Sequence, residues 1–130
     1  MARLGTTGGA RAISTASGAS VATASTYISL HTADPTTTGA GGSEATGGSP
    51  AYARKLVTWN TATFSAGIET VTSAVSATLD VPAGTYAWFG IWDAVSGGNY
   101  LMGGTCTSQV FSAQGQYVIA SGGITVTATA

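Results

Sequence analysis

The chain has 130 residues, of which only 7% are charged, and its net charge at pH 7 is −1; an ordinary soluble domain carries about 25% charged residues. Four basic residues cannot neutralise a nucleic-acid backbone, and one cysteine can form neither an internal disulfide nor a cysteine-based zinc site. No apolar run approaches the roughly 18–20 residues of a membrane span. These counts exclude nucleic-acid binding and membrane spanning and fit a single domain with one compact core.

Residues 1–25 are almost all small, and their glycines and lack of apolar periodicity predict neither a helix nor a strand. We interpret them as an extended N-terminal arm in front of a folded domain at 26–130. Such a segment buries too little apolar surface to offset the conformational entropy of ordering it, so contact with other chains is expected to order it. The partner contacts predicted for the arm are its two arginines and its larger apolar side chains: Arg3, Leu4, Arg11, Ile13 and Val21.

The β pattern starts after the arm. A short apolar run at 27–31 ends at a turn where Asp34 precedes a proline, a pair typical of turns because proline fixes φ and the aspartate bonds the turn backbone. A Gly-, Ser- and Thr-rich loop follows over 36–50. Residues 51–59 alternate between two faces and predict a strand. Arg54 near its start is expected either to be solvated or to meet an acidic partner.

The richest apolar segment lies at 86–92, after a second alternating run at 68–79 and a turn at 81–84. It is apolar on both faces and predicts a central strand covered on two sides, as in a sandwich. Trp88 and Trp92 are four residues apart and therefore share a face of this strand. We interpret both indoles as core residues.

Glycine turns separate the remaining segments. Residues 96–99 predict a hairpin turn into a strand at 100–102, and residues 121–123 predict a second hairpin between 117–120 and 124–128. Short strands, regular glycine turns and the lack of a helical period together predict an all-β fold. The expected architecture is an antiparallel β-sandwich with an extended N-terminal arm.

Candidates for chemistry are few. His31 lies three residues before Asp34, so a catalytic pair with a serine nucleophile can be drawn; the simpler interpretation is that His31 ends a strand and Asp34 bonds the turn. The carboxylates are scattered and favour neither a glycosidase nor a calcium site. If exposed, Trp59, Trp88 and Trp92 could stack on sugar rings, but the core is preferred for the last two. We predict no catalytic residue, no metal site and no cofactor.

The surface that this composition provides consists of Thr, Ser, Gly and Ala with little charge. Such a surface is weakly hydrated and offers little repulsion against self-association. Two interpretations remain open. One is a secreted or thermally robust domain that is merely rich in threonine, and the sharper one is a subunit whose surface is covered by neighbours in an assembly.

Three segments in this order resemble a family of small virion proteins of tailed bacteriophages: YISLHTADP at 27–35, GGSPAYAR at 47–54 and FGIWDAVSGGN at 89–99. Members are labelled tail fibre or minor tail proteins, and similar small β-domains serve as capsid decoration proteins. The resemblance covers roughly residues 27–130 and implies a structural protein without catalytic residues. The chain departs from the family at its beginning, where many relatives have a short apolar, helix-like segment instead of the arm.

The resemblance and the low surface charge lead to one main hypothesis. The chain is expected to be a non-enzymatic capsid decoration protein that binds the outside of the phage head and stabilises it. Its expected partners are the major capsid protein or other virion proteins, and its expected oligomer is a homotrimer; neither nucleic acid nor membrane is an expected partner. A tail-tip or tail-fibre component is the alternative, followed by a carbohydrate-binding module, with an enzyme last.

Overall fold

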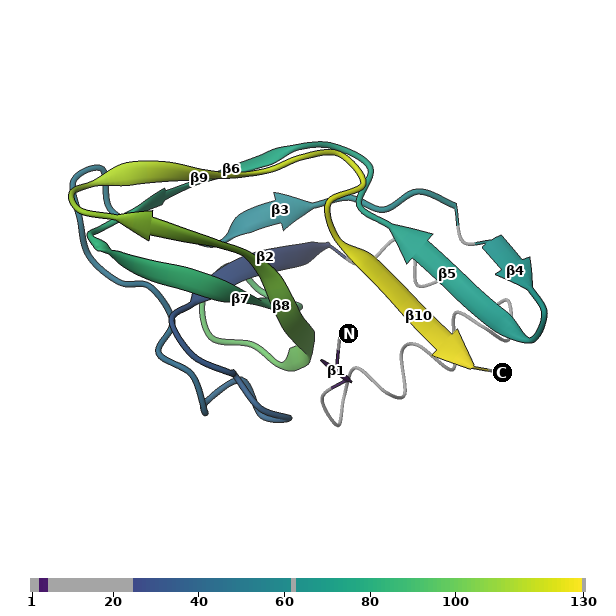
Figure 1. The fold of residues 1–130 in the computed structure, drawn as a ribbon. Coiled ribbons are helices and arrows are strands. Elements are labelled where there is room, and N and C mark those ends of the chain that lie inside the picture. Colours follow the sequence, from purple (N-terminus) through teal and green to yellow (C-terminus); the bar gives the residue numbers. More distant parts are fainter. Residues whose placement is uncertain (1–2, 5–24, 62, 130) are drawn as a thin grey trace.

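The computed structural model describes residues 3–4, 25–61 and 63–129, and the regular structure of these ranges consists of strands (Figure 1). In chain order the strands are β1 (Arg3–Leu4), β2 (Thr26–His31), β3 (Lys55–Val57), β4 (Thr63–Ser65), β5 (Ile68–Thr72), β6 (Ala77–Val81), β7 (Gly84–Trp92), β8 (Tyr100–Phe111), β9 (Gly115–Ile119) and β10 (Thr125–Thr129). No residue of the described ranges is helical. The predicted all-β class is therefore confirmed.

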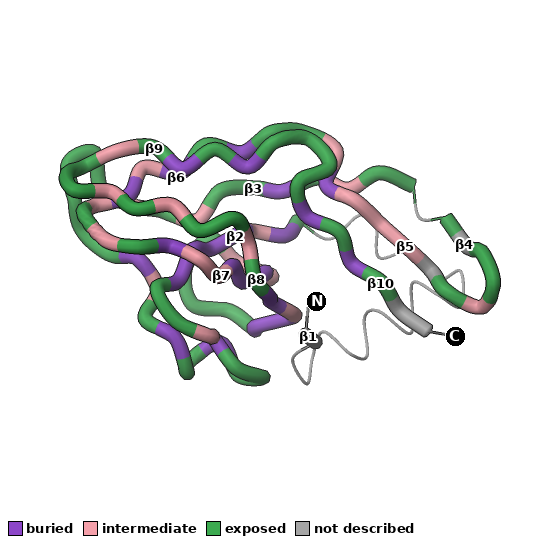
Figure 2. The backbone as a smooth tube through the Cα atoms, viewed as in Figure 1, coloured by how far each residue is buried: buried purple, intermediate pink, exposed green. Residues whose placement is uncertain are grey.

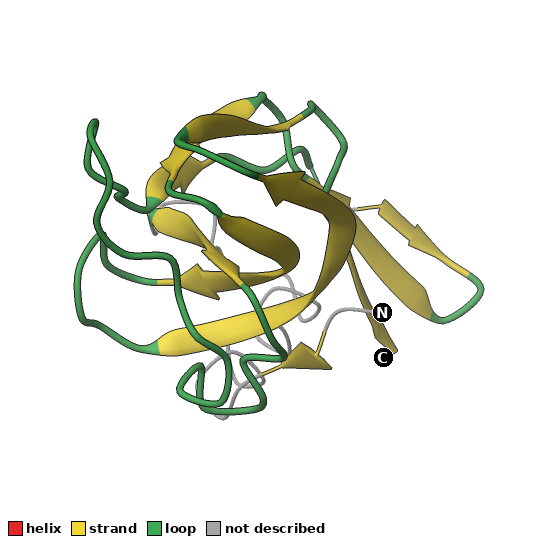
Figure 3. Cartoon of the chain, turned by 60° about the vertical axis from the view of Figure 1, so that its left-hand side comes forward, coloured by secondary structure: helices red, strands yellow, loops and turns green. Residues whose placement is uncertain are grey.

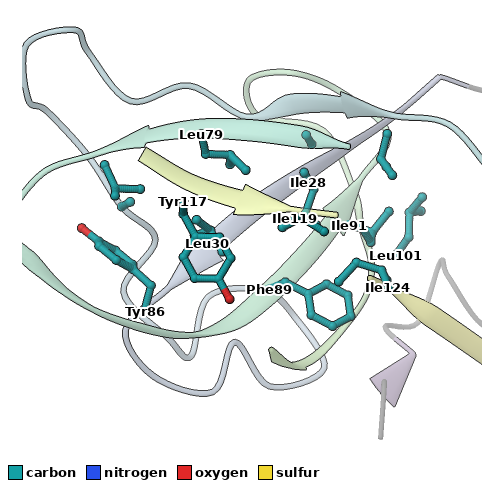
Figure 4. Close-up of a cluster of buried hydrophobic side chains, with 14 of the residues drawn as sticks. Ile28, Leu30, Leu79, Tyr86, Phe89, Ile91, Leu101, Tyr117, Ile119 and Ile124 are labelled. Carbon is teal, nitrogen blue, oxygen red and sulfur yellow. The ribbon is translucent and has the colours of Figure 1, made fainter. Parts of the chain in front are cut away.

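Three antiparallel sheets contain these strands. The largest has the order β1-β8-β7-β2-β3, the second is the pair β6-β9, and the third has the order β10-β5-β4. Side chains from the largest sheet and from the β6-β9 pair meet in one core between the two layers (Figure 4). This is the predicted antiparallel sandwich. The third sheet extends away from it on one side (Figure 1, Figure 3).

The core lies between the two layers because a strand directs alternate residues to the same side. In β6, Ala77, Leu79 and Val81 are buried while the residues between them are more exposed. In the opposing sheet, Ile28 of β2 lies directly opposite Ile91 of β7, and both are fully buried. Complete burial of a large aliphatic side chain stabilises the fold by about 1.5–3 kcal/mol. Alternation in the sequence thus translates directly into the two-layer core.

The central strand of the largest sheet is β7, as the sequence predicted. It pairs with β2 along one edge and with β8 along the other. The hairpin predicted at 96–99 joins β7 to β8. Asp93 closes this turn, because its Oδ1 accepts a hydrogen bond from the Asn99 amide at 2.6 Å and its Oδ2 accepts one from Asn99 Nδ2 at 2.8 Å.

The second predicted hairpin is wrong. β9 pairs with β6 and β10 pairs with β5, so residues 121–123 carry the chain from one sheet to another. Ser73 holds this crossing: its amide donates to the Ile124 carbonyl at 2.9 Å, its carbonyl accepts from the Gly122 amide at 2.7 Å, and its hydroxyl accepts from the Ile124 amide at 3.2 Å. The run predicted at 68–79 breaks at the same place, because β5 and β6 belong to different sheets. A glycine turn between two apolar runs does not reveal which strands they pair with.

The strand predicted at 51–59 is shorter than expected, since β3 spans only Lys55–Val57. The residues before β3 belong to a long loop that starts after β2. The tip of this loop is linked to β2 by an isolated bridge between Glu44 and His31. The loop therefore returns to the sheet it left, and this return builds the site described below.

The third sheet, formed by β4, β5 and β10 and called the projecting sheet from here on, is the less buried region of the fold (Figure 2). Val126 of β10 is buried, with 5% of its surface exposed, and belongs to the core cluster of the sandwich. Ile68 at the start of β5 is 45% exposed. Burial thus fades along the projecting sheet with distance from the sandwich.

Candidate functional site

Arg54 connects two loops of the chain, the one after β2 and the one between β7 and β8. Its Nε and Nη2 donate to the two carboxylate oxygens of Glu44 at 2.7 and 2.8 Å, which is a bidentate ion pair. Its Nη1 donates to the carbonyls of Ala94 at 3.2 Å and Gly97 at 2.8 Å. Of the two expectations for Arg54, the acidic partner is the one found.

The guanidinium of Arg54 also stacks on an indole, with its Cζ 3.7 Å from the centroid of the Trp92 ring. Tyr100 meets the same indole edge-on, with ring centroids 5.2 Å apart. Gly39 leaves space for the indole, because a Cβ at this position would lie 2.6 Å from Trp92 Cη2. A cation–π contact contributes about 0.5–2 kcal/mol. Trp92 is therefore held between the sheet and the loop that covers it.

A chain of hydrogen bonds lies beneath Trp92. Its Nε1 donates to Ser29 Oγ at 2.8 Å, and the same Oγ lies 2.8 Å from His31 Nε2. His31 Nδ1 lies 3.1 Å from the Gly42 carbonyl. Because a carbonyl only accepts, the proton of the neutral imidazole is on Nδ1, and Nε2 accepts a hydrogen bond from the Ser29 hydroxyl. This series of hydrogen bonds holds the loop against β2 and β7, and each polar group in it has a partner.

The pairing of His31 excludes the catalytic interpretation. His31 and Ser29 are both 0% exposed, so a substrate cannot reach them. Burial lowers the pKa of the His31 imidazole, which keeps it neutral at pH 7. Both ring nitrogens of His31 face other groups, Ser29 Oγ and the Gly42 carbonyl, while Asp34 Oδ1 accepts a hydrogen bond from the Thr36 amide at 2.8 Å. The simpler interpretation, a strand end followed by a bonded turn, is confirmed.

The tryptophans of β7 lie on the outer face of the sheet rather than in the core. Trp88 and Trp92 share a face, as predicted, but Phe89 and Ile91 are the residues that point into the core (Figure 4). Trp92 is covered by the loop, and Trp88 is partly exposed. The core prediction for this pair is wrong because a four-residue spacing shows that two residues share a face but not which face is inside. Trp59 is half-buried against the edge of the core.

The structure shows part of the predicted arm. The sequence predicted no strand in the arm and expected other chains to order it. For Arg3 and Leu4 this is wrong: they form β1 on the chain's own sheet, where backbone pairing with β8 places Arg3 opposite Gly103 and Leu4 opposite Met102. The other predicted partner contacts lie outside the described residues: Arg11, Ile13 and Val21. Contact of the arm with another chain, and the domain boundary at residue 25, stay predictions.

Other surface features are dispersed. Several large apolar side chains are exposed and belong to different strands and loops: Leu56, Ile68, Val75, Val95, Val110 and Val118. Such single exposed residues are ordinary. Within the described ranges, no three His, Cys, Asp or Glu side chains come together as a metal ion would require. That part of the chain also contains no helix of the length and apolarity needed to cross a membrane.

Comparison with known protein families identifies the family of this chain. The family model described as Podophage GP4 fiber I protein gp80 matches residues 12–127, which is most of the chain. The chain belongs to this family. The gp80 fibre family consists of structural proteins of the phage virion, so the resemblance drawn from the three sequence segments is confirmed. No curated protein matches the chain.

For this member of the gp80 fibre family, sequence reasoning missed the bonded chain under the loop. A signal was present, because β2 contains a serine and β7 contains a glycine, and Ser29 and Gly90 lie directly opposite each other. Two small residues facing each other leave room for their larger neighbours, here His31 and Trp92. A Cβ at Gly90 would lie 2.7 Å from Ser29 Oγ and 3.1 Å from His31 Nε2. Glu44 gave no such signal, since loop closure decides its position.

Proposed function

We propose that the chain is a non-enzymatic subunit of a fibre-type appendage of a tailed-phage virion. The observation that carries this proposal is the family match over residues 12–127, whose model is described as a podophage fibre protein. The inaccessible Ser29–His31 pair supports the non-enzymatic part, and the low charge supports a role as an assembly subunit. Head decoration, the first hypothesis from the sequence, is the competing role.

The proposed role is mechanical, so it needs a rigid body and surfaces that other subunits can bind. The sandwich is the rigid body, and Arg54 fastens its two neighbouring loops. Sheet edges supply the binding surfaces, because their backbone N–H and C=O groups can pair with a strand of another chain. The sparse charge leaves little repulsion between copies. A homo-oligomer, with a trimer as the expected form, fits these properties.

The position and copy number of the chain in purified virions test this proposal. Gold-labelled antibodies against the chain are expected at the tail vertex, with antibodies against the major capsid protein as the control that labels the head. Quantitative gels are expected to show few copies relative to the major capsid protein. Label spread over the head, with a copy number comparable to that of the capsid protein, would contradict the fibre role and support decoration. Absence from purified virions would contradict both roles.

A further inference from the structure

One edge of β8 is paired along much of its length and the other is not. β8 has 12 residues, and β7 pairs with it from Gly84 to Trp92. On the opposite edge, the only strand among the described residues that pairs with β8 is β1, at Met102 and Gly103 (Figure 1). No described strand pairs with the rest of that edge.

The sequence of β8 does not protect this edge. Exposed edges in native proteins commonly carry lysine, proline or other charged residues that discourage a further strand. β8 reads YLMGGTCTSQVF and contains neither a charge nor a proline. Its pairing with β7 is regular over 102–105, with a register shift on either side of this stretch. Gly103 and Gly104 are both buried, and because Gly103 has no side chain the backbone of β1 approaches it closely.

β1 shows which strand fits this edge. Arg3 lies opposite Gly103 and Leu4 opposite Met102 in an antiparallel arrangement. A strand of two residues makes few ladder hydrogen bonds, so little holds this pairing within one chain. We propose that, when copies of the chain assemble, the edge of β8 at 102–105 binds strand β1 of a second copy.

A second copy is the occupant that the pairing favours. The same segment of a neighbour offers the same residues in the same register, so exchange between copies preserves each contact and is a low-cost route to an oligomer. Pairing between chains competes with pairing within one chain once the local concentration of copies reaches the effective concentration of the tethered β1, which is on the order of millimolar. Exchange from each copy to the next gives a ring, such as the expected trimer, where the rotation between neighbouring copies closes, and an open filament where it does not. The inference rests on the proposed function, because it needs an assembly of copies.

Disulfide trapping in the full-length chain tests the exchange. In a Cys106→Ser background, Leu4→Cys and Met102→Cys place two thiols at positions that lie directly opposite in the β1–β8 pairing, within reach of a disulfide. The two single-cysteine variants are mixed in equal amounts and oxidised mildly. Non-reducing gels and mass spectrometry are expected to show dimers that join one variant to the other. The control pairs Leu4→Cys with Val118→Cys on the exposed side of β9 and should give no such dimer.

The double variant, Leu4→Cys with Met102→Cys in one chain, distinguishes exchange between copies from pairing within one chain. Covalent oligomers support exchange between copies, whereas a disulfide closed only within single chains, together with no mixed dimer, would overturn it. Since Met102 is half-buried, a second measurement leaves β8 unchanged: Leu4 is replaced by a photo-crosslinking residue, and isotope-labelled and unlabelled copies are mixed. Cross-links that join a labelled peptide to an unlabelled one support the exchange. If every cross-link joins two peptides with the same label, the exchange is contradicted. Both experiments use purified chain, so their outcome is independent of where the chain lies in the virion.

Discussion

The sandwich and the projecting sheet are built from the same kind of antiparallel strand but are stabilised differently. In the sandwich, two layers bury side chains completely, as at Leu30, Leu79 and Ile91, each 0% exposed. In the projecting sheet, Val126 is buried where it meets the sandwich, and Ile68 is 45% exposed. The comparison teaches that strand pairing alone does not bury apolar surface; a second layer is what does so.

The two regions share a narrow junction. Ser73 and Ile124 are 1% and 3% exposed and bond to each other at the point where the chain crosses between the sheets. We therefore expect changes inside the sandwich to affect the whole fold, and changes in the projecting sheet or on the outer face to have smaller effects. The predictions that follow set matched positions against each other.

The largest difference is expected between the two faces of β7. Phe89→Ala should lower the free energy of unfolding by about 3–5 kcal/mol, because the ring is 3% exposed and its removal leaves a cavity. Trp88→Ala, one residue away on the outer face, should lower it by less than about 2 kcal/mol. Urea denaturation of both variants measures the difference. Equal losses would mean that Trp88 belongs to the core after all.

Two isoleucines compare the sandwich and the projecting sheet directly. Ile91→Ala should lower the free energy of unfolding by about 2–5 kcal/mol, since the side chain is fully buried. Ile68→Ala removes the same atoms from a side chain that is 45% exposed and should cost less than about 1 kcal/mol. Urea denaturation measures the free energy of unfolding of both variants. A large loss at Ile68 would show that the projecting sheet is as tightly packed as the sandwich.

Substitution of Arg54 tests whether this residue holds together the loop after β2 and the loop between β7 and β8. Arg54→Lys keeps the charge but cannot make the bidentate contact with Glu44 or the flat stacking on Trp92, so stability should fall by about 1.5–3 kcal/mol. The adjacent Lys55→Ala is the control, and its exposed side chain should matter by less than about 0.5 kcal/mol. Thermal unfolding followed by tryptophan fluorescence measures both. If the two variants behave alike, the loop is not held by Arg54.

The smallest expected effect is a pH dependence from His31. Burial lowers its pKa in the fold, so below the ordinary value of 6.5 the unfolded chain binds more protons than the folded one. Its contribution to stability is therefore constant above about pH 7 and falls as the pH drops through 6.5, with a slope of at most about 1.4 kcal/mol per pH unit. His31→Asn retains a donor for the Gly42 carbonyl without titrating and should flatten the curve. An unchanged slope in this variant would assign the effect to another group.

The sequence predicted the elements that local pattern determines. The apolar run at 86–92 became the central strand, and the turns at Asp34 and at 96–99 form as expected, because proline, aspartate and glycine act on the backbone locally. The same reasoning could not predict that Ser73 and Ile124 mark a crossing between sheets. A turn between two runs looks alike whether the runs pair with each other or with distant strands.

The candidate site could be predicted only in part for a related reason. The alternation in β7 placed Trp88 and Trp92 together, but the choice of inner face depends on which layer the rest of the chain supplies. The ion pair of Arg54 with Glu44 depends on how the loop after β2 closes, which composition does not encode. What the sequence did predict correctly was the family, since three separated segments in a fixed order are specific where each alone is not.

We propose that the sandwich folds without the N-terminal arm and that the arm is its docking element in the particle. Deleting residues 2–25 tests it most directly, with the full-length chain prepared in parallel as the control. The truncated chain should still unfold cooperatively, because the buried core lies between β2 and β10. Its number of copies per purified virion should fall to near zero, because β1 and the rest of the arm are lost. Virions that carry a full complement of the truncated chain would contradict the account.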